Sequence, residues 1–294
     1  MAGSLPAAEE HGEVPSISSE LQEHLSTWDG ARKRMLAAAQ TLPTCDVILF
    51  VATKTEEACL KFAAEELGLP FNLCRDPGNG QEYFDLGVIE KQRVLAARTE
   101  MGPFAHGGAA ARAIHLRVAT GATSLIGVGM AFGCLPQVQH YGDILLSTGV
   151  IPYDYRIVRD GPGHQPESDY SKTRAYPPHP GEVARFRDFA NRPEWRGKVW
   201  PGFLLSGGAR IHSAQFRDQL VQELTDKGGS VVGGDMEGAG LLSASPTDAP
   251  CWMIVKAISD FADSSRDEVI KETRPVACYS AAQFVLRTIA AGPG

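Results

Sequence analysis

Apolar residues occur along the chain in two patterns that predict alternating strands and helices. Short runs rich in apolar and β-branched residues predict buried strands over Cys45–Ala52, Val94–Ala97, Ser124–Val128, Asp143–Ser147 and Trp252–Lys256. Apolar positions at helical spacing predict helices over Glu56–Leu67, His106–Ala119, Ala214–Leu224, Ala239–Ala244 and from about Arg266 to Ala290. Because strands alternate with helices, the sequence predicts a layered α/β fold, with a parallel sheet as the simplest arrangement.

The residues before Cys45 follow a different pattern. Residues 1 to about 16 are small, acidic and proline-bearing, a composition typical of a flexible tail. From Ser19 onward, amphipathic spacing predicts one or two helices that end near Pro43. We therefore expect a flexible tail and N-terminal helical extension over residues 1–45, followed by a catalytic domain over residues 46–294.

The stretch between Arg159 and Pro201 is rich in proline, glycine and charge, which is typical of a loop, and a short helix fits Glu182–Ala190. Long excursions from a compact domain often cover an active site. A plain surface loop and a subunit contact would have the same composition, so all three interpretations stay open.

Charge and cysteine usage narrow the classes of partner. The formal net charge of −7, with acidic and basic residues interleaved, argues against binding to nucleic acid or to an anionic membrane and favours a small molecule. The six cysteines include no Cys-x-x-Cys pair and the histidines form no cluster at metal-ligand spacing, so we expect no zinc, disulfide framework or cofactor. No signal-peptide pattern and no apolar run of about 18 residues occurs, which favours the cytoplasm.

Two segments that follow early apolar runs are candidates for chemistry. Glu56 lies just beyond the carboxyl end of the first predicted strand, where ligands of open α/β sheets bind, and its carboxylate can accept a proton from water. A helix first-turn acid is the alternative. In the Gly-rich stretch Ile126–Gly133, we expect Gly129, Met130 and Ala131 to form a ligand floor or a tight turn. Its spacing does not fit a dinucleotide fingerprint.

Two later segments add carboxylates. Asp235 and Glu237 lie among glycines, and an ionised Glu237 can accept hydrogen bonds from both hydroxyls of a ribose, while Met236 fits the sugar face or the core. Ser259 and Asp260 follow the last apolar strand. A partly desolvated Asp260 can hold a proton for the N7 atom of a departing purine, and a helix N-cap is the alternative for both residues.

In order and spacing these segments resemble the nucleoside phosphorylase and nucleosidase superfamily, particularly the methylthioadenosine/S-adenosylhomocysteine nucleosidases, over roughly residues 46–290. The anchors are Ala52 to Glu56, the Gly-rich stretch with Gly142-Asp-Ile-Leu after it, Ser206-Gly207, Asp235 to Glu237, and Ile258 to Asp263. The resemblance implies a three-layer αβα sandwich around a mixed, partly closed sheet. It also implies a homodimer or higher homo-oligomer.

The resemblance implies a role for each matched residue. Glu56 resembles the base that activates water, Met236 and Glu237 resemble the ribose-binding pair, and Asp260 resembles the residue that protonates purine N7, with Ser259 orienting it. Ile211 would offer backbone groups to the purine edge. His106, Tyr153 and Tyr155 are candidates for the 5′ side of the substrate.

Two departures from the family pattern bear on the reaction and the substrate. The phosphorylases have an arginine where this chain has Gly127, so the cation that clamps phosphate is missing, although Arg98 is a candidate substitute. The nucleosidases have an aromatic ring where this chain has Arg210, whose guanidinium can stack on a base or pair with an anion.

The sequence therefore predicts an enzyme that hydrolyses the N-glycosidic bond of a purine nucleoside or 5′-modified adenosine. Candidate substrates are methylthioadenosine, S-adenosylhomocysteine and an adenine nucleotide. A phosphate-dependent phosphorylase and a non-catalytic purine sensor of the same fold are the alternatives.

Overall fold

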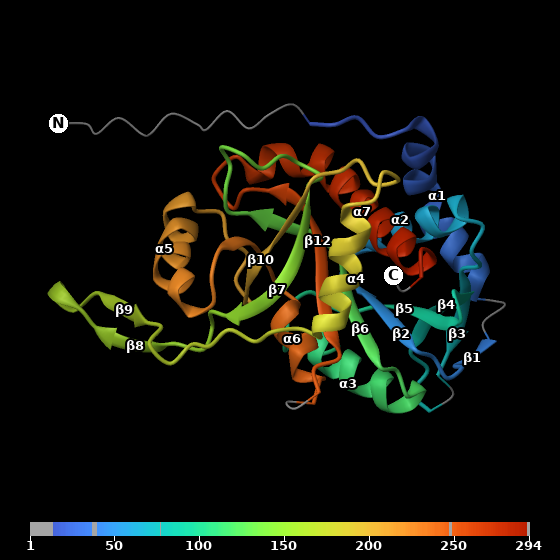
Figure 1. Cartoon of the computed structure of the whole chain (residues 1–294), viewed down its shortest axis with the longest axis horizontal. Helices are drawn as coiled ribbons and strands as arrows, with labels where there is room; N and C mark the ends of the chain where they lie inside the picture. Colours follow the sequence, from blue (N-terminus) through green and yellow to red (C-terminus); the bar gives the residue numbers. More distant parts are fainter. Residues whose placement is uncertain (1–13, 37–39, 77, 247–248, 293–294) are drawn as a thin grey trace.

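The computed structural model describes residues 14–36, 40–76, 78–246 and 249–292. Most of the predicted tail, residues 1–13, lies outside the described residues. The helices are α1 (Ser19–Leu36), α2 (Lys54–Glu66), α3 (Ala109–Thr120), α4 (Pro180–Ala190), α5 (Ala214–Leu224), α6 (Gly238–Ser243) and α7 (Arg266–Ala290), with 3₁₀ turns η1 (Pro162–His164) and η2 (Thr225–Lys227). The predicted central and C-terminal helices are thus confirmed within a few residues (Figure 1). The N-terminal helix is confirmed as well, but it ends at Leu36 and not near Pro43, because a short strand over Gln40–Thr41 follows it.

One large mixed sheet forms the centre of the molecule. Its ten strands run in the order β1-β3-β4-β5-β2-β6-β11-β10-β7-β12. They are β1 (Gln40–Thr41), β2 (Val47–Val51), β3 (Asn72–Arg75), β4 (Glu82–Ile89), β5 (Gln92–Arg98), β6 (Ser124–Gly133), β7 (Ile144–Pro152), β10 (Val199–Ser206), β11 (Val231–Asp235) and β12 (Trp252–Asp260). Parallel pairing joins β2 to β5 and β6, and antiparallel pairing joins β6 to β11 and β7 to β12. A wholly parallel sheet is therefore wrong, and the mixed sheet is confirmed.

The sheet closes on itself in part. Strand β6 pairs with β11 on one side and with β12 as well, and β12 pairs with β7, so β6, β11, β10, β7 and β12 form a ring. The strand β6 extends to Gly133, so the Gly-rich stretch Ile126–Gly133 is a strand and not the tight turn considered above. Glycines in it allow close packing of neighbouring elements.

Helices cover both faces of the sheet, which confirms the three-layer αβα architecture. Along β2, Val47, Leu49 and Val51 face a core that includes α2 and α7, whereas Ile48 and Phe50 face a second core that includes α3. In Figure 1, α2 and α7 lie on one side of the sheet and α3 and α6 on the other.

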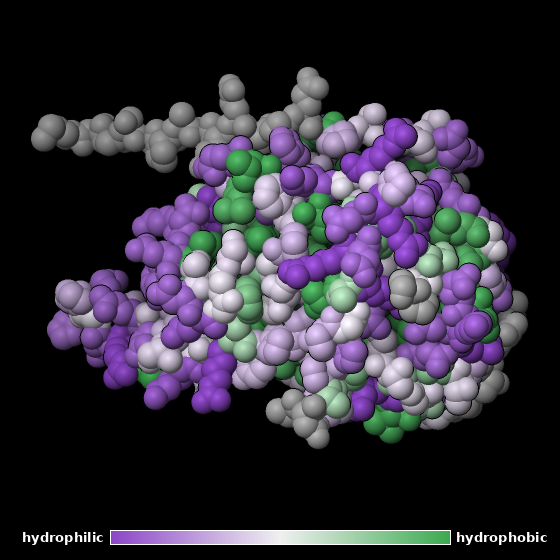
Figure 2. Space-filling model, viewed as in Figure 1, coloured by the Kyte–Doolittle hydropathy of each residue, from purple (hydrophilic) through white to green (hydrophobic). Residues whose placement is uncertain are grey.

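The loop-rich stretch after β7 contains a two-stranded hairpin, β8 (Ile157–Asp160) and β9 (Pro166–Asp169), before α4. This hairpin projects from the body of the molecule (Figure 1), and its surface is mostly hydrophilic (Figure 2). None of the helices in the described part of the chain is long and apolar enough to cross a membrane.

Candidate active site

A cavity of about 240 Å³ lies where the carboxyl ends of several strands meet. The parallel strands of an α/β sheet bring the loops after them to one edge, which explains why segments far apart in sequence converge here. The predicted residues that line this cavity are Glu56, Met130, Ala131, Arg210, Ile211, Asp235, Met236, Glu237, Ser259 and Asp260. Gly129 is not among the lining residues.

Glu56 lies in the first turn of α2 and is buried. Its Oε2 accepts hydrogen bonds from the amides of Ala52 (2.7 Å) and Thr53 (2.8 Å), and its Oε1 accepts one from the amide of Met130 (2.9 Å). The Thr53 hydroxyl in turn accepts a bond from the Glu56 amide, which completes a capping box. Glu56 is therefore both the helix-capping acid and a carboxylate at the cavity wall.

Gly129 packs against the carboxylate of Glu56 and does not line the cavity as the predicted ligand floor would. Its backbone has φ +139°, and a Cβ at this position would lie 1.8 Å from Glu56 Oε1. Only glycine adopts this conformation readily, and only glycine leaves room for the carboxylate.

Replacement of Gly129 by alanine is expected to destabilise the fold by about 1–3 kcal/mol through backbone strain and to displace Glu56. Chemical denaturation and a steady-state assay measure the two effects. The control is Gly163→Ala, because Gly163 also has a positive φ (+70°) but open space around its missing Cβ. Equal losses of activity in the two variants would contradict the proposed contact.

A buried lysine that the sequence analysis missed joins two of the carboxylates. Lys256 of β12 is 1% exposed, and its Nζ lies 3.2 Å from Glu237 Oε2 and 3.6 Å from Glu56 Oε1. Burial alone lowers the pKa of Lys256, but the charges of Glu56, Glu237 and Asp235 outweigh it and raise the pKa well above its ordinary value. Lys256 is therefore an ammonium. Its position inside an apolar strand is the signal that could have revealed it, because lysine is almost never fully buried without a partner.

Asp235 ends β11, and Glu237 follows it two residues later. Asp235 accepts hydrogen bonds from the Gly238 amide (3.0 and 3.1 Å), and Glu237 Oε1 accepts one from the Gly102 amide (3.3 Å). Burial raises the pKa of both carboxyl groups, and Lys256 acts against this rise. Two buried carboxyl groups contact the one ammonium and the charge of Asp235 also acts on it, which makes this end of the cavity a favourable place for positive charge.

Asp260 ends β12 and is 4% exposed. Its Oδ2 accepts a hydrogen bond from the Ser259 hydroxyl (2.9 Å), its Oδ1 accepts one from the Ala262 amide (3.0 Å), and Arg266 Nε lies 3.3 Å from Oδ2. Burial raises the pKa of Asp260, against the charge of Arg266 and the two hydrogen bonds. The helix-cap alternative for Ser259 and Asp260 is wrong, because the N-cap of α7 is Ser265.

The loop after β10 supplies the opposite wall. Arg210 is exposed and donates a hydrogen bond to the sulfur of Met101 (3.1 Å), while Ile211 is buried beside it. The tyrosine at 153 is buried with its hydroxyl donating to the Ala209 carbonyl (3.1 Å). It lies outside the cavity lining, as do His106, Tyr155 and residues 159–201. The excursion between Arg159 and Pro201 therefore does not cover this cavity.

A known protein family and solved structures match most of the chain. The family model of the phosphorylase superfamily matches residues 48–290. The chain belongs to this superfamily. A death domain-containing ATP nucleosidase from Amphimedon queenslandica is 34% identical over 89 residues, which cover 30% of this chain and 16% of that protein. The chain thus matches only a small part of the length of that relative.

Solved structures show the same fold. A 5′-methylthioadenosine/S-adenosylhomocysteine nucleosidase from Neisseria meningitidis, in complex with methylthio-immucillin-A, has a TM-score of 0.67 and 19% identity, covering 84% of this chain and 99% of that one. Futalosine hydrolase of Helicobacter pylori has a TM-score of 0.66 and 20% identity, covering 84% and 97%. At these identities the likeness establishes the fold.

In this superfamily member, neither Gly127, at the position of the missing arginine, nor the candidate substitute Arg98 lines the cavity. A Cβ on Gly127 would lie 2.8 Å from side-chain atoms of Ile254 and Leu241, so the position is packed within the core. Arg98 Nε lies 3.3 Å from Glu57 Oε2, and Arg98 is absent from the described cavity lining. Arg210, Arg266 and Arg274 are the arginines that line the cavity.

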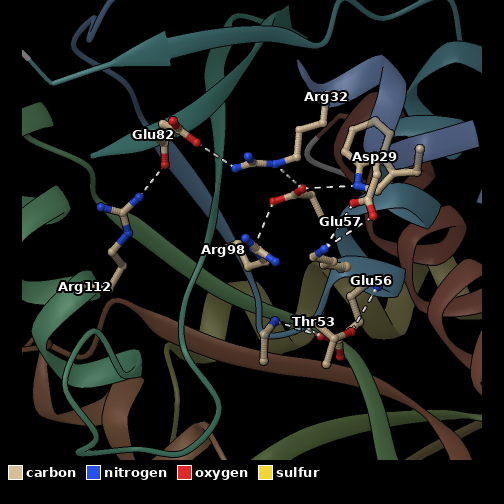
Figure 3. Close-up of polar contacts among 11 residues, drawn as sticks. Asp29, Arg32, Thr53, Glu56, Glu57, Glu82, Arg98 and Arg112 are labelled. Carbon is tan, nitrogen blue, oxygen red and sulfur yellow. Dashed lines mark hydrogen bonds and ion pairs between the residues drawn. The ribbon is translucent and has the colours of Figure 1, made fainter. Parts of the chain in front are cut away.

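The helix α1 is held next to Glu56 by hydrogen bonds to the following residue, Glu57. Glu57 is buried and accepts hydrogen bonds from Trp28 Nε1 (3.2 Å) and Arg32 Nε (2.7 Å), with Arg98 on its other oxygen. Figure 3 shows Glu57 between these two arginines, with Glu56 next to it in the same first turn of α2. The N-terminal extension therefore packs against the turn of α2 that carries Glu56. The division of the chain into two parts at residue 45 stays a prediction.

Proposed function

We propose that the protein is a purine N-ribosyl hydrolase that cleaves a purine nucleoside or a 5′-modified adenosine into free base and ribosyl product. The observation that carries this proposal is the convergence of Glu56, Glu237 and Asp260, all buried, on one cavity at the strand ends. Membership of the phosphorylase superfamily supports it, as do the names of similar proteins, which include nucleosidases and a relative that acts on ATP.

Asp260 acts on the leaving base. Its raised pKa lets it hold a proton and pass it to, or share it with, purine N7, so that the base leaves as a neutral molecule. Ser259 fixes the direction of the carboxyl group through its hydrogen bond to Oδ2. Arg210 and Ile211 lie where they can contact the base.

Glu56 acts on water. As the bond between C1′ and the base nitrogen breaks, the ribosyl group becomes oxocarbenium-like, and a water oxygen forms the new bond to C1′ while Glu56 accepts its proton. The excess of carboxyl groups over the single ammonium of Lys256 stabilises this positive charge. Lys256 positions Glu56 and Glu237, and Met236 and Glu237 hold the ribose, with Asp235 shaping their turn through Gly238.

A substrate panel tests the proposal. Purified protein is incubated with adenosine, methylthioadenosine, S-adenosylhomocysteine, inosine and ATP, with and without phosphate, and free base is measured by chromatography. We expect base release from at least one compound without added phosphate. Release that needs phosphate and yields ribose 1-phosphate would indicate a phosphorylase instead, and ligand binding without release would indicate a sensor.

Replacement of Glu237 by glutamine is expected to weaken ribose recognition by about 1.5–3 kcal/mol, the contribution of a charged hydrogen bond. The effect should appear mainly in KM, measured with the best substrate of the panel. Exposed Glu223 of α5 offers the control Glu223→Gln, which should leave KM unchanged. If the Glu237→Gln enzyme had wild-type kcat and KM, Glu237 would not bind the ribose.

We also propose that the protein acts in the cytoplasm as a homodimer or higher homo-oligomer. All six cysteines are free, which suits a reducing compartment. The oligomer rests on the family resemblance, and light scattering coupled to gel filtration measures it directly.

A further inference from the structure

Next to the cavity lies a second hollow, a groove of about 380 Å³ between α1, α2 and α7. Its lining residues are Leu25, Ser26, Trp28, Asp29, Lys54, Thr55, Ala58, Ile270, Lys271, Arg274 and Pro275. Arg274 lines both the groove and the cavity. At the start of α2, the N-cap residue Thr53 and Glu56 line the cavity, whereas Lys54 and Thr55 line the groove. The two hollows therefore adjoin.

The groove carries more positive than negative charge. Lys54, Lys271 and Arg274 face one acidic lining residue, Asp29. Lys271 and Arg274 are three residues apart on α7 and so share a face of the helix. The Nε atom of Arg274 is buried and has no hydrogen-bond partner in the described part of the chain. A buried donor without a partner suits an anionic ligand.

The acidic lining residue, Asp29, does not neutralise the positive charge of the groove. Asp29 Oδ1 lies 3.2 Å from Lys54 Nζ, but the side chains are 68% and 62% exposed. Exposed pairs of this kind are weak and exchange readily for another partner. Figure 3 shows Asp29 close to the turn that carries Thr53 and Glu56.

The groove adjoins the ribose end of the cavity. The residues proposed to contact the purine, Arg210, Ile211 and Asp260, line the cavity and are absent from the groove. Glu56, which is proposed to accept the proton from water at C1′, is only two residues from Lys54 of the groove. A group that leaves the cavity towards Arg274 and Lys271 is therefore a substituent on the ribose and not on the purine.

We propose that this groove is an anion subsite for the 5′-phosphate chain of the substrate, so that the preferred substrate class is purine nucleoside 5′-phosphates. The inference rests on the proposed N-ribosyl hydrolysis and specifies its substrate. Arg274 contacts the phosphate nearest the ribose, and Lys271 and Lys54 contact phosphates further along. Hydrolysis at C1′ would then release free purine and a ribose that keeps its 5′-phosphates.

The test compares kcat/KM for adenosine, AMP and ATP in four proteins: wild type, Lys271→Gln, Arg274→Gln and the control Lys172→Gln. Lys172 is exposed and lies outside the groove. We expect the wild type to prefer AMP or ATP over adenosine. The ratio of kcat/KM for ATP to that for adenosine should fall about 10-fold or more in each groove variant, the scale of one charged hydrogen bond, and stay constant in the control. Lys271 is exposed, so its variant is expected to fold.

A binding measurement separates failure of the subsite from failure of the chemistry. Isothermal titration of Asp260→Asn, alone and with Lys271→Gln added, compares ATP with adenosine. Tighter binding of ATP that is lost with Lys271→Gln supports the subsite even if no protein releases base, in which case only the proposed hydrolysis fails. Base release from adenosine and ATP at equal rates, unaffected by either groove substitution, overturns the subsite while the hydrolase stands.

Discussion

Replacement of Asp260 by asparagine is expected to lower kcat by about 10²-fold or more, the scale of catalysis by a positioned acid. Asparagine keeps the shape of the side chain: its oxygen can accept the bond from the Ala262 amide and its nitrogen can donate to the Ser259 hydroxyl oxygen, so the fold should survive. It cannot deliver a proton to the purine. The loss should therefore appear in kcat, measured by base release at saturating substrate.

The control for this variant is Asp267→Asn. Asp267 also lies near Arg266, with Oδ1 3.8 Å from its Nη1, but its side chain is 76% exposed. We expect this variant to retain wild-type kcat. If both variants lost activity to the same small extent, Asp260 would not be the acid.

The pH dependence of kcat follows from the same residue. Burial raises the pKa of Asp260 above its ordinary value of 3.8, so its proton is present below the raised pKa and is lost as pH rises through it. Wild-type kcat should therefore decline towards high pH, with a midpoint above 3.8. The Asp260→Asn enzyme should lack this decline, whereas an identical decline in both proteins would assign it to another group.

Replacement of Lys256 by methionine is expected to cost about 3–5 kcal/mol of stability, because it leaves Glu56, Asp235 and Glu237 buried without their cation. Because the methionine side chain is similar in length to lysine, the loss of stability reflects the missing positive charge more than a change in side-chain volume. Chemical denaturation at neutral pH measures it. Catalysis should fall as well, since Lys256 is the contact that Glu56 and Glu237 share.

The conservative variant Lys256→Arg keeps the positive charge and should recover most of the stability and part of the activity. Lys172→Met on the exposed surface should leave both unchanged. If Lys256→Met were as stable as the wild type, Lys256 would not be the cation that compensates the buried carboxyl groups, and the proposed stabilisation of a ribosyl cation would lose its basis.

The sequence predicted strands and helices where local pattern and tertiary burial agree. The apolar runs of β2 and β12 and the spacing of α5 and α7 are of this kind. Strands β10 and β11 were missed, because Pro201, Gly233 and Gly234 weaken a strand pattern. The glycines there are required by neighbours that no local pattern reveals: a Cβ on Gly234 would lie 2.4 Å from the Phe132 ring.

The sequence predicted those residues of the candidate site that lie at or just beyond the ends of strands. Glu56 and Glu237 follow strands and Asp260 ends one, and the sheet brings them together. Contacts made across the sheet were not predictable in the same way. Lys256 lies within an apolar run, Gly129 is explained only by Glu56 above it, and Arg266 and Arg274 reach the cavity because α7 returns across β12 and β6.

The most direct test of hydrolysis in this cavity is base release in phosphate-free buffer by the wild type and Asp260→Asn, purified side by side and assayed with the best substrate of the panel. We predict that the wild type releases purine and ribosyl product in equal amounts without phosphate, and that the variant does so about 10²-fold more slowly. No release by the wild type, a strict need for phosphate, or equal rates in the two proteins would contradict the account.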